Sequence, residues 1–69
     1  MSWEYNETEA RETIRLYMVG TLNVRSSRLN HIVGMIETGE VLMADVLHVG
    51  GEHLAGQVRE CARRLEVEL

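Results

Sequence analysis

The sequence has no lysine, proline or phenylalanine and only one cysteine, Cys61, among its 69 residues. A single cysteine excludes an intramolecular disulfide, and one cysteine beside three histidines does not make up a structural zinc site. The longest apolar runs, such as residues 16–19, are far shorter than the ~18 residues that a membrane-spanning helix needs. No basic and apolar leader opens the chain. These absences predict a cytoplasmic protein that uses no cofactor, no metal and no membrane.

Positive charge is also scarce, since seven arginines stand against eleven acidic residues for a net charge of −4. An acidic balance opposes general binding to nucleic acid or to an anionic membrane surface. Arginine without lysine is typical of protein interfaces, because the planar guanidinium stacks and forms paired hydrogen bonds. A GC-rich genome would bias codon choice in the same direction, so both explanations stay open.

Enough apolar residues remain to predict a folded chain. Leucine, isoleucine and valine make up 19 of the 69 residues, above the ~20% below which disorder is the default expectation. The length predicts one domain, residues 1–69, but a domain of this size buries only about 60% of its unfolded surface. With disulfides and zinc excluded, association with another chain is the remaining source of stability.

The first segment has the pattern of a helix that begins near Asn6. Asn6 and Glu9 have the spacing of a capping box, and acidic residues fill the first turn, where the helix dipole favours them. Apolar residues then fall on one face, and Leu16 adds an apolar group off that face. A helix end that is apolar almost all round predicts self-association, because so short a chain has little material to cover it. The residues on the apolar face are Ala10, Ile14, Tyr17 and Met18, with Leu22 if the helix continues.

A second helix is predicted from a cap at Ser26 or Ser27 to an end at Thr38 and Gly39. Its apolar residues match the helical template at every position, and they are Leu29, Ile32, Val33 and Ile36. The apolar stretch 41–49 that follows is too short to separate helix from strand. Residues 31–36 and 41–49 also fit a β-hairpin, which would make the fold αββα. Helix is favoured because the second stretch contains Leu, Met and Ala.

The last segment, after Gly50 and Gly51, is an amphipathic helix. Its apolar seam is Leu54, Val58, Cys61 and Leu65, with four charged residues outside it. Such a helix is usually half of a pair, whose mate lies in the same chain or in another. We therefore predict an all-α domain, three to four short helices forming a small bundle completed by dimerisation. The predicted dimer interface consists of Ile14, Tyr17, Met18, Leu54, Val58, Cys61 and Leu65.

No set of residues in the sequence makes up a catalytic site, and we predict that the chain is not an enzyme. Asp45 and His48 have the i, i+3 spacing of two metal ligands, but two ligands do not make a site. His48 suits a helix C-terminus, where a positive charge is favoured. Cys61 lies in the apolar seam and is predicted to be a small buried residue and not a reactive thiol.

The sequence thus predicts a small protein-protein interaction module, a homodimeric regulator or inhibitor of phage or plasmid type that binds a larger protein of unknown identity. Aromatic and arginine residues dominate interface hot spots, so the predicted partner-binding residues are Trp3, Tyr5, Arg25 and Arg28. The alternative is a helix-turn-helix DNA-binding regulator built from residues 27–49. Its second helix carries Glu40 and Asp45 and no arginine, which opposes binding to phosphates.

Overall fold

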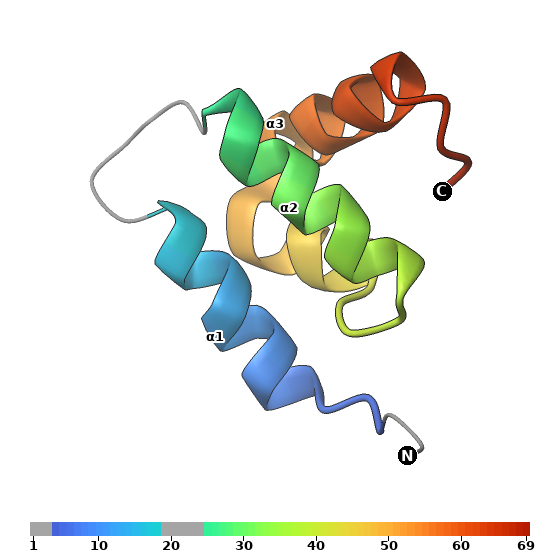
Figure 1. Cartoon of the computed structure of the whole chain (residues 1–69). Helices are drawn as coiled ribbons and strands as arrows, with labels where there is room; N and C mark the ends of the chain where they lie inside the picture. Colours follow the sequence, from blue (N-terminus) through green and yellow to red (C-terminus); the bar gives the residue numbers. More distant parts are fainter. Residues whose placement is uncertain (1–3, 19–24) are drawn as a thin grey trace.

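The computed structural model describes residues 4–18 and 25–69, and within them it contains three helices and no strand. These are α1 (Glu7–Met18), α2 (Ser26–Glu37) and α3 (Met43–Arg64). Helices α1 and α2 each pack against α3 and contact one another much less (Figure 1). The prediction of a small all-α domain is confirmed. The αββα alternative is wrong, because residues 31–36 belong to α2 and the stretch from Met43 to Val49 is helical.

Helix α1 begins as its capping signal predicts. The backbone N–H of Glu9 donates to the Asn6 side-chain oxygen at 3.0 Å, which satisfies one of the amides that every helix start leaves unpaired. Ala10 and Ile14 are the buried residues of α1 and face the core. The predicted continuation of this helix to Leu22 lies outside the described residues.

Helix α2 begins at Ser26, so its N-cap lies before both serines predicted to cap it. Arg25 occupies the N-cap position and makes no side-chain cap bond, so the predicted serine cap is wrong: Ser26 is already the first helical residue. The helix ends at Thr38 and Gly39 as predicted, with Gly39 at φ 81°, a left-handed conformation that glycine adopts without steric cost. The buried residues of α2 are Leu29, Ile32, Val33 and Met35, while the predicted core residue Ile36 is only partly buried.

Helix α3 runs through the predicted break at Gly50 and Gly51 but changes direction there. Gly51 has φ 67° and ψ −167°, a non-helical conformation that joins two helical arms, residues 43–50 and residues 52–64. The first arm lies behind α1 and α2, and the second leads away toward the C-terminus (Figure 1). Because of this bend, a single chain segment can cover both α1 and α2. No helix in the described residues is long and apolar enough to cross a membrane.

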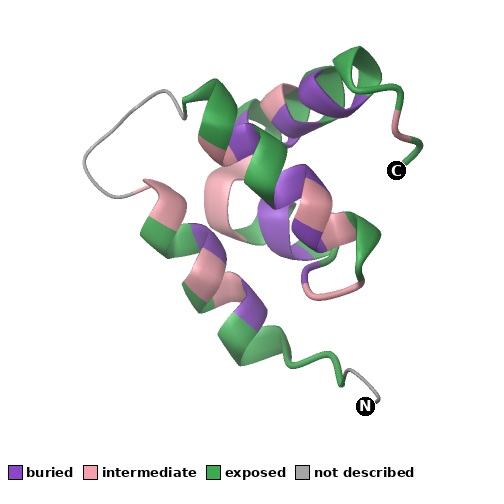
Figure 2. Cartoon of the chain, in the orientation of Figure 1, coloured by how far each residue is buried: buried purple, intermediate pink, exposed green. Residues whose placement is uncertain are grey.

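The core is a single cluster built by all three helices and by the loop before α3. Figure 2 shows the buried positions on the inward sides of the helices, with exposed positions outside. Val41, in the loop, is fully buried and closes the cluster beside α2. Its members are Ala10, Ile14, Leu29, Ile32, Val33, Met35, Val41, Val46, Leu54, Ala55, Val58, Cys61 and Ala62.

Candidate functional site

Helices α1 and α2 are joined at one end of each. The Arg28 guanidinium donates to the Tyr17 backbone oxygen at 3.0 Å, and the Tyr17 and His31 rings pack in a tilted arrangement with centroids 5.2 Å apart. Tyr17 lies in the last turn of α1, whereas Arg28 lies in the first turn of α2. The Arg28 bond satisfies a carbonyl near the α1 C-terminus, where backbone oxygens lack helical partners and a positive charge is favoured.

The same two helices leave a groove toward their other ends, where the start of α1 approaches the loop after α2. A depression of about 300 Å³ on α2 and this loop, open to solvent, adjoins a smaller cavity of about 60 Å³ against α1, and Glu40 lines both. We call the two together the α1–α2 groove. Its α2 side is lined by His31, Gly34, Met35, Thr38 and Glu40, and its α1 side by Glu4, Asn6, Glu9, Ala10 and Thr13.

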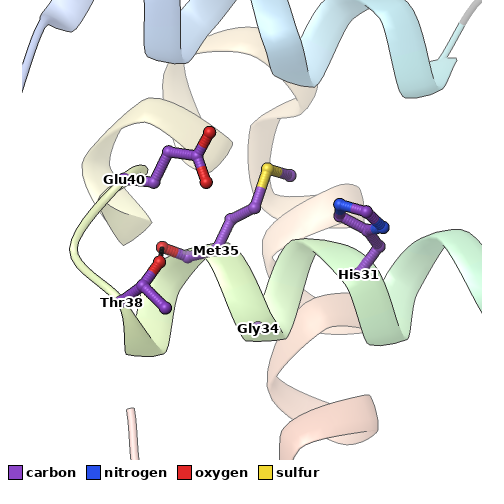
Figure 3. A pocket seen from close by; sticks show the side chains of 5 residues that line it. All are labelled: His31, Gly34, Met35, Thr38 and Glu40. Carbon is purple, nitrogen blue, oxygen red and sulfur yellow. Dashed lines mark hydrogen bonds between the residues drawn. The ribbon is translucent and has the colours of Figure 1, made fainter.

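The α2 side of the groove combines an apolar floor with polar edges. His31, Met35 and Glu40 point toward α1 (Figure 3), and Met35 is 5% exposed between the other two. Gly34 has open space where a side chain would begin, since a Cβ atom there would meet nothing within 4 Å. The lack of a side chain at this position is what keeps the depression open.

The groove carries negative charge that the described part of the chain does not neutralise. Within residues 4–18 and 25–69, Glu4, Glu9 and Glu40 form no salt bridge, although all three line the groove. The arginines that do pair have other partners: Arg11 with Glu7 and Asp45, Arg15 with Glu12, Arg59 with Glu52 and Arg63 with Glu60.

A buried carboxylate at Asp45 holds the N-terminal part of the chain against α3. One Asp45 oxygen accepts from the Tyr5 hydroxyl at 2.5 Å and from the Leu42 N–H at 3.1 Å, and the other accepts from Arg11 Nε at 3.0 Å. Arg11 also pairs with Glu7 at 3.1 Å. These bonds connect the segment before α1, α1 itself and the start of α3, so they fix the α1 side of the groove.

The hydrogen bonds at Asp45 shift two pKa values in opposite directions. Burial by itself would raise the pKa of Asp45, but the bonds from Tyr5, the Leu42 N–H and Arg11, with the arginine charge, lower it below 3.8. The bond to Asp45, with burial and the nearby negative charge, raises the pKa of Tyr5 from 10.0 to about 12. Asp45 is therefore an ionised structural anchor. Of the two residues with metal-ligand spacing, Asp45 has its oxygens bound to these donors and His48 is exposed.

The predicted partner-binding residues are not gathered on one surface. Trp3 lies outside the described residues. Tyr5 is 39% exposed and bound to Asp45 near the start of α1, whereas Arg25 and Arg28 lie near the end of that helix. The helix has 12 residues, which separates its two ends by about 18 Å. Arg28 is held by Tyr17, and Arg25 is exposed at the α2 N-cap.

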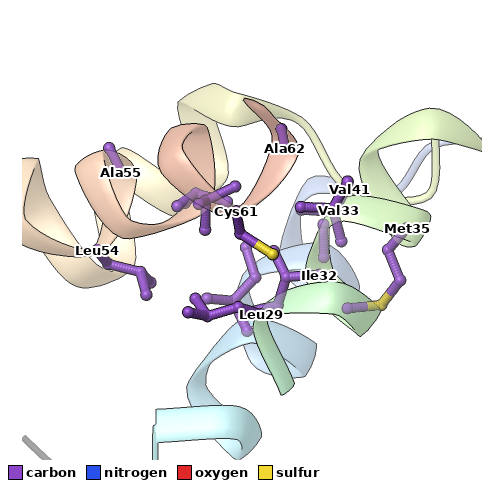
Figure 4. Close-up of a cluster of buried hydrophobic side chains, with 13 residues drawn as sticks. Leu29, Ile32, Val33, Met35, Val41, Leu54, Ala55, Cys61 and Ala62 are labelled. Carbon is purple, nitrogen blue, oxygen red and sulfur yellow. The ribbon is translucent and has the colours of Figure 1, made fainter. Parts of the chain in front are cut away.

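Four of the predicted dimer-interface residues pack inside the chain itself. Figure 4 shows Leu54 and Cys61 among the core side chains, and Ile14, Leu54, Val58 and Cys61 are each at most 1% exposed. The mate of the α3 seam is therefore α2 of the same chain, where Cys61 Sγ donates to the Asn30 side-chain oxygen at 2.9 Å. These four residues are corrected from interface to core. The remaining three are accessible, since Tyr17 and Met18 are partly buried and Leu65 is 45% exposed.

The sequence missed the groove because its lining combines residues that are distant along the chain. Two parts of the lining had separate sequence signals. Asn6 was predicted as a helix cap, and Glu40 was assigned to the second helix of the helix-turn-helix alternative, whereas it lies in the loop before α3. Comparison with known proteins finds no match: no family model, curated protein or solved structure is significantly similar to the chain.

Proposed function

We propose that this chain is a small non-enzymatic protein-binding module, a homodimeric regulator or inhibitor that acts on a larger protein. The observation that carries the proposal is the α1–α2 groove, which has an apolar floor at Met35 and carboxylates without partners inside the described chain. Protein interfaces combine an apolar centre with a polar rim. A partner side chain can bury itself over Met35 while its neighbours pair with the rim.

The openness of the groove favours a macromolecular partner over a small substrate. Pockets for small molecules enclose 70–90% of the ligand's surface, which requires walls on several sides. The larger depression has walls only on α2 and the following loop and is open to solvent elsewhere. A segment of a larger protein needs no such walls, because the rest of the partner protein shields the side of the segment that faces away from the groove.

The homodimer part of the proposal rests on the apolar end of α1. Leu16 is 70% exposed, the highest value among the exposed large apolar residues in the described part of the chain, and the neighbouring Tyr17 and Met18 are only partly buried. Tyr17 and Met18 pack against the chain's own core, so Leu16 is the apolar side chain at this helix end that a second copy would cover. Self-association would also supplement the limited core of so small a domain.

Steric filling of the groove tests the proposed function. Gly34→Trp places a large side chain in the groove, and Gly56→Trp is the matched control, because Cβ atoms at both glycines meet nothing within 4 Å and Gly56 is exposed on α3. Tagged wild-type protein and both variants are used to capture partners from a native lysate, washed at high salt with nuclease present. We expect one protein at stoichiometric level with wild type and with Gly56→Trp, and its loss with Gly34→Trp.

Two results would count against this proposal. Equal capture by all three proteins would show that the groove is not the binding surface. Retention of nucleic acid alone, released by salt, would replace the proposal with the DNA-binding alternative, in which α2 and the first arm of α3 form a helix-turn-helix. Circular dichroism of each variant confirms that the fold is retained.

A further inference from the structure

We infer that the α1–α2 groove binds a cationic amphipathic segment of the partner, with an apolar side chain over Met35 and lysine or arginine on either side of it. This inference rests on the proposed function and adds the chemistry of the partner. Two features of the groove support it, namely the unpaired negative charge and the apolar floor. The other possible occupants also fit the groove less well.

The charge of the groove selects a positive ligand. Glu9 from α1 and Glu40 from the loop after α2 line the same cavity, with Glu4 beside them. All three are left without a salt bridge within residues 4–18 and 25–69. Because the carboxylates come from two elements, a cation bound in this cavity can pair with both sides of it. Arginine is favoured over lysine where its planar fork can pair with two oxygens.

The floor of the groove selects an apolar side chain next to that cation. Met35 lies between His31 and Glu40 in Figure 3, and its thioether is flexible enough to adapt to different apolar partners. Gly34 leaves space above the helix surface for the incoming side chain. Because Met35 is flanked by polar residues, the ligand must alternate apolar and polar groups over a short distance. This pattern is that of an amphipathic segment.

Other occupants fit the groove less well. A second copy of the chain has a net charge of −4, and four of its seven arginines, namely Arg11, Arg15, Arg59 and Arg63, are already paired within the chain. The phosphates of a nucleic acid would meet the same carboxylates and be repelled. A free apolar peptide would leave the charged rim unpaired. A basic amphipathic segment of a different protein satisfies both the floor and the rim.

Binding of designed peptides tests this inference. The probe is a fluorescein-labelled helical peptide with a leucine stripe flanked by arginines, and two matched peptides replace either all arginines by glutamate or all leucines by serine. Fluorescence anisotropy is measured for wild type, Glu40→Arg and Glu68→Arg. The last variant changes net charge equally at an exposed residue beyond α3. Amide chemical shifts locate the bound peptide.

We expect the arginine–leucine peptide to bind wild type, with amide shifts concentrated at residues 31–40 and 4–13. Glu40→Arg should weaken binding by about tenfold relative to Glu68→Arg, since one attractive pair is replaced by a repulsive one. The glutamate and serine peptides should both bind more weakly. Salt should weaken binding to wild type more than binding to Glu40→Arg.

The inference is overturned by equal weakening in the two variants, by shifts outside the groove, or by equal binding of the serine peptide. Absence of binding by the arginine–leucine peptide overturns it as well. The proposed function has a separate test, because it depends on steric blocking at Gly34. A natural partner that Gly34→Trp releases but Glu40→Arg does not would support the protein-binding function and refute the cationic ligand.

Discussion

Asp45 is the only charged or polar residue that the described part of the chain buries completely. A buried carboxylate is costly unless donors satisfy it, and hydrogen bonds to an ionised group are stronger than neutral ones. Here the donors come from three places: the Tyr5 hydroxyl, the Arg11 guanidinium and the Leu42 backbone. One residue thus holds the chain entry and α1 in place and also provides a hydrogen-bond acceptor at the start of α3.

Removing either end of the Tyr5–Asp45 bond should destabilise the fold. We expect Asp45→Asn to cost about 1.5–3 kcal/mol in free energy of unfolding, since bonds to a charged group contribute about this much. Tyr5→Phe should lower stability by less, because this ring is 39% exposed. Urea denaturation of both single variants and the double variant measures the coupling.

Tyr17→Phe is the control for these variants. Tyr17 contributes its ring to His31 and its backbone carbonyl to Arg28, and the substitution removes neither. Additive effects of Tyr5→Phe and Asp45→Asn would contradict a direct bond between the two side chains.

Stability should fall in acid because of Asp45. Its folded pKa lies below the ordinary value of 3.8. The stabilisation from the ionised form is therefore fully present above that value and is lost as pH decreases through the folded pKa. Unfolding midpoints from neutral pH down to about pH 2 measure this loss, and Asp45→Asn should show a shallower decline. A wild-type decline no steeper than that of the variant would refute the assignment.

At alkaline pH, stability should fall as pH rises, because Tyr5 loses its proton. The pKa of Tyr5 is raised from 10.0 to about 12 in the fold. The stabilisation from the neutral phenol is fully present below 10.0 and is lost as pH rises through about 12. Tyr5→Phe removes this dependence, which absorbance titration of the tyrosines can follow.

At the scale of the helix, glycine position determines the course of α3. Gly51 adopts φ 67° and ψ −167°, a combination that only glycine occupies without strain. At Gly50 a Cβ atom would lie 2.4 Å from the Leu54 side chain, so the bend also brings this turn close to the core. Gly56, in the second arm, has helical geometry and open space around it.

Replacing glycine by alanine should therefore lower the free energy of unfolding at one position of α3 and raise it at another. Gly51→Ala should destabilise by about 1–3 kcal/mol because the backbone conformation is strained for any other residue. Gly56→Ala should stabilise by up to ~1 kcal/mol, since alanine is the better helix former. Thermal unfolding followed by circular dichroism measures both. A stabilised Gly51→Ala protein would mean that α3 is straight in solution.

For the whole molecule, two helices are attached to one bent helix and hardly to each other. The groove follows from this arrangement: α1 and α2 meet near Tyr17, and a cavity lined by Glu9 and Glu40 lies between the start of α1 and the loop after α2. The same arrangement leaves the outer side of α1 without cover, with Leu16 70% exposed. The apolar surface at this end is where we expect a second copy to bind.

Leu16→Glu should convert a dimer into a monomer without loss of helix. The expected reason is that a carboxylate would be buried at the contact between copies without a partner. Sedimentation equilibrium gives the mass, and the melting temperature of wild type, but not of the variant, should rise with protein concentration. Leu69→Glu is the control, because Leu69 is 48% exposed at the C-terminal end. A monomeric wild type would remove the homodimer from the proposal.

Local pattern was sufficient to predict most of the elements. The start of α1 at Asn6, the buried residues Leu29, Ile32 and Val33, and the seam of Leu54, Val58 and Cys61 all follow from helical spacing and capping. These features depend on residues within two turns of each other, so the sequence contains the whole signal. The serine cap of α2 was wrong because Arg25 takes the N-cap position.

Helical periodicity favoured an all-α fold, indicated most of the inward face of each helix and marked the glycines at which the chain can turn. It could not predict that Gly51 bends one helix, that α2 covers the seam of α3, or that Glu40 and Glu9 line the same cavity. Asp45 is 40 residues from Tyr5 and 34 from Arg11 along the chain, yet its environment depends on both. Such contacts depend on how the helices pack, and periodicity within a single helix carries no information about them.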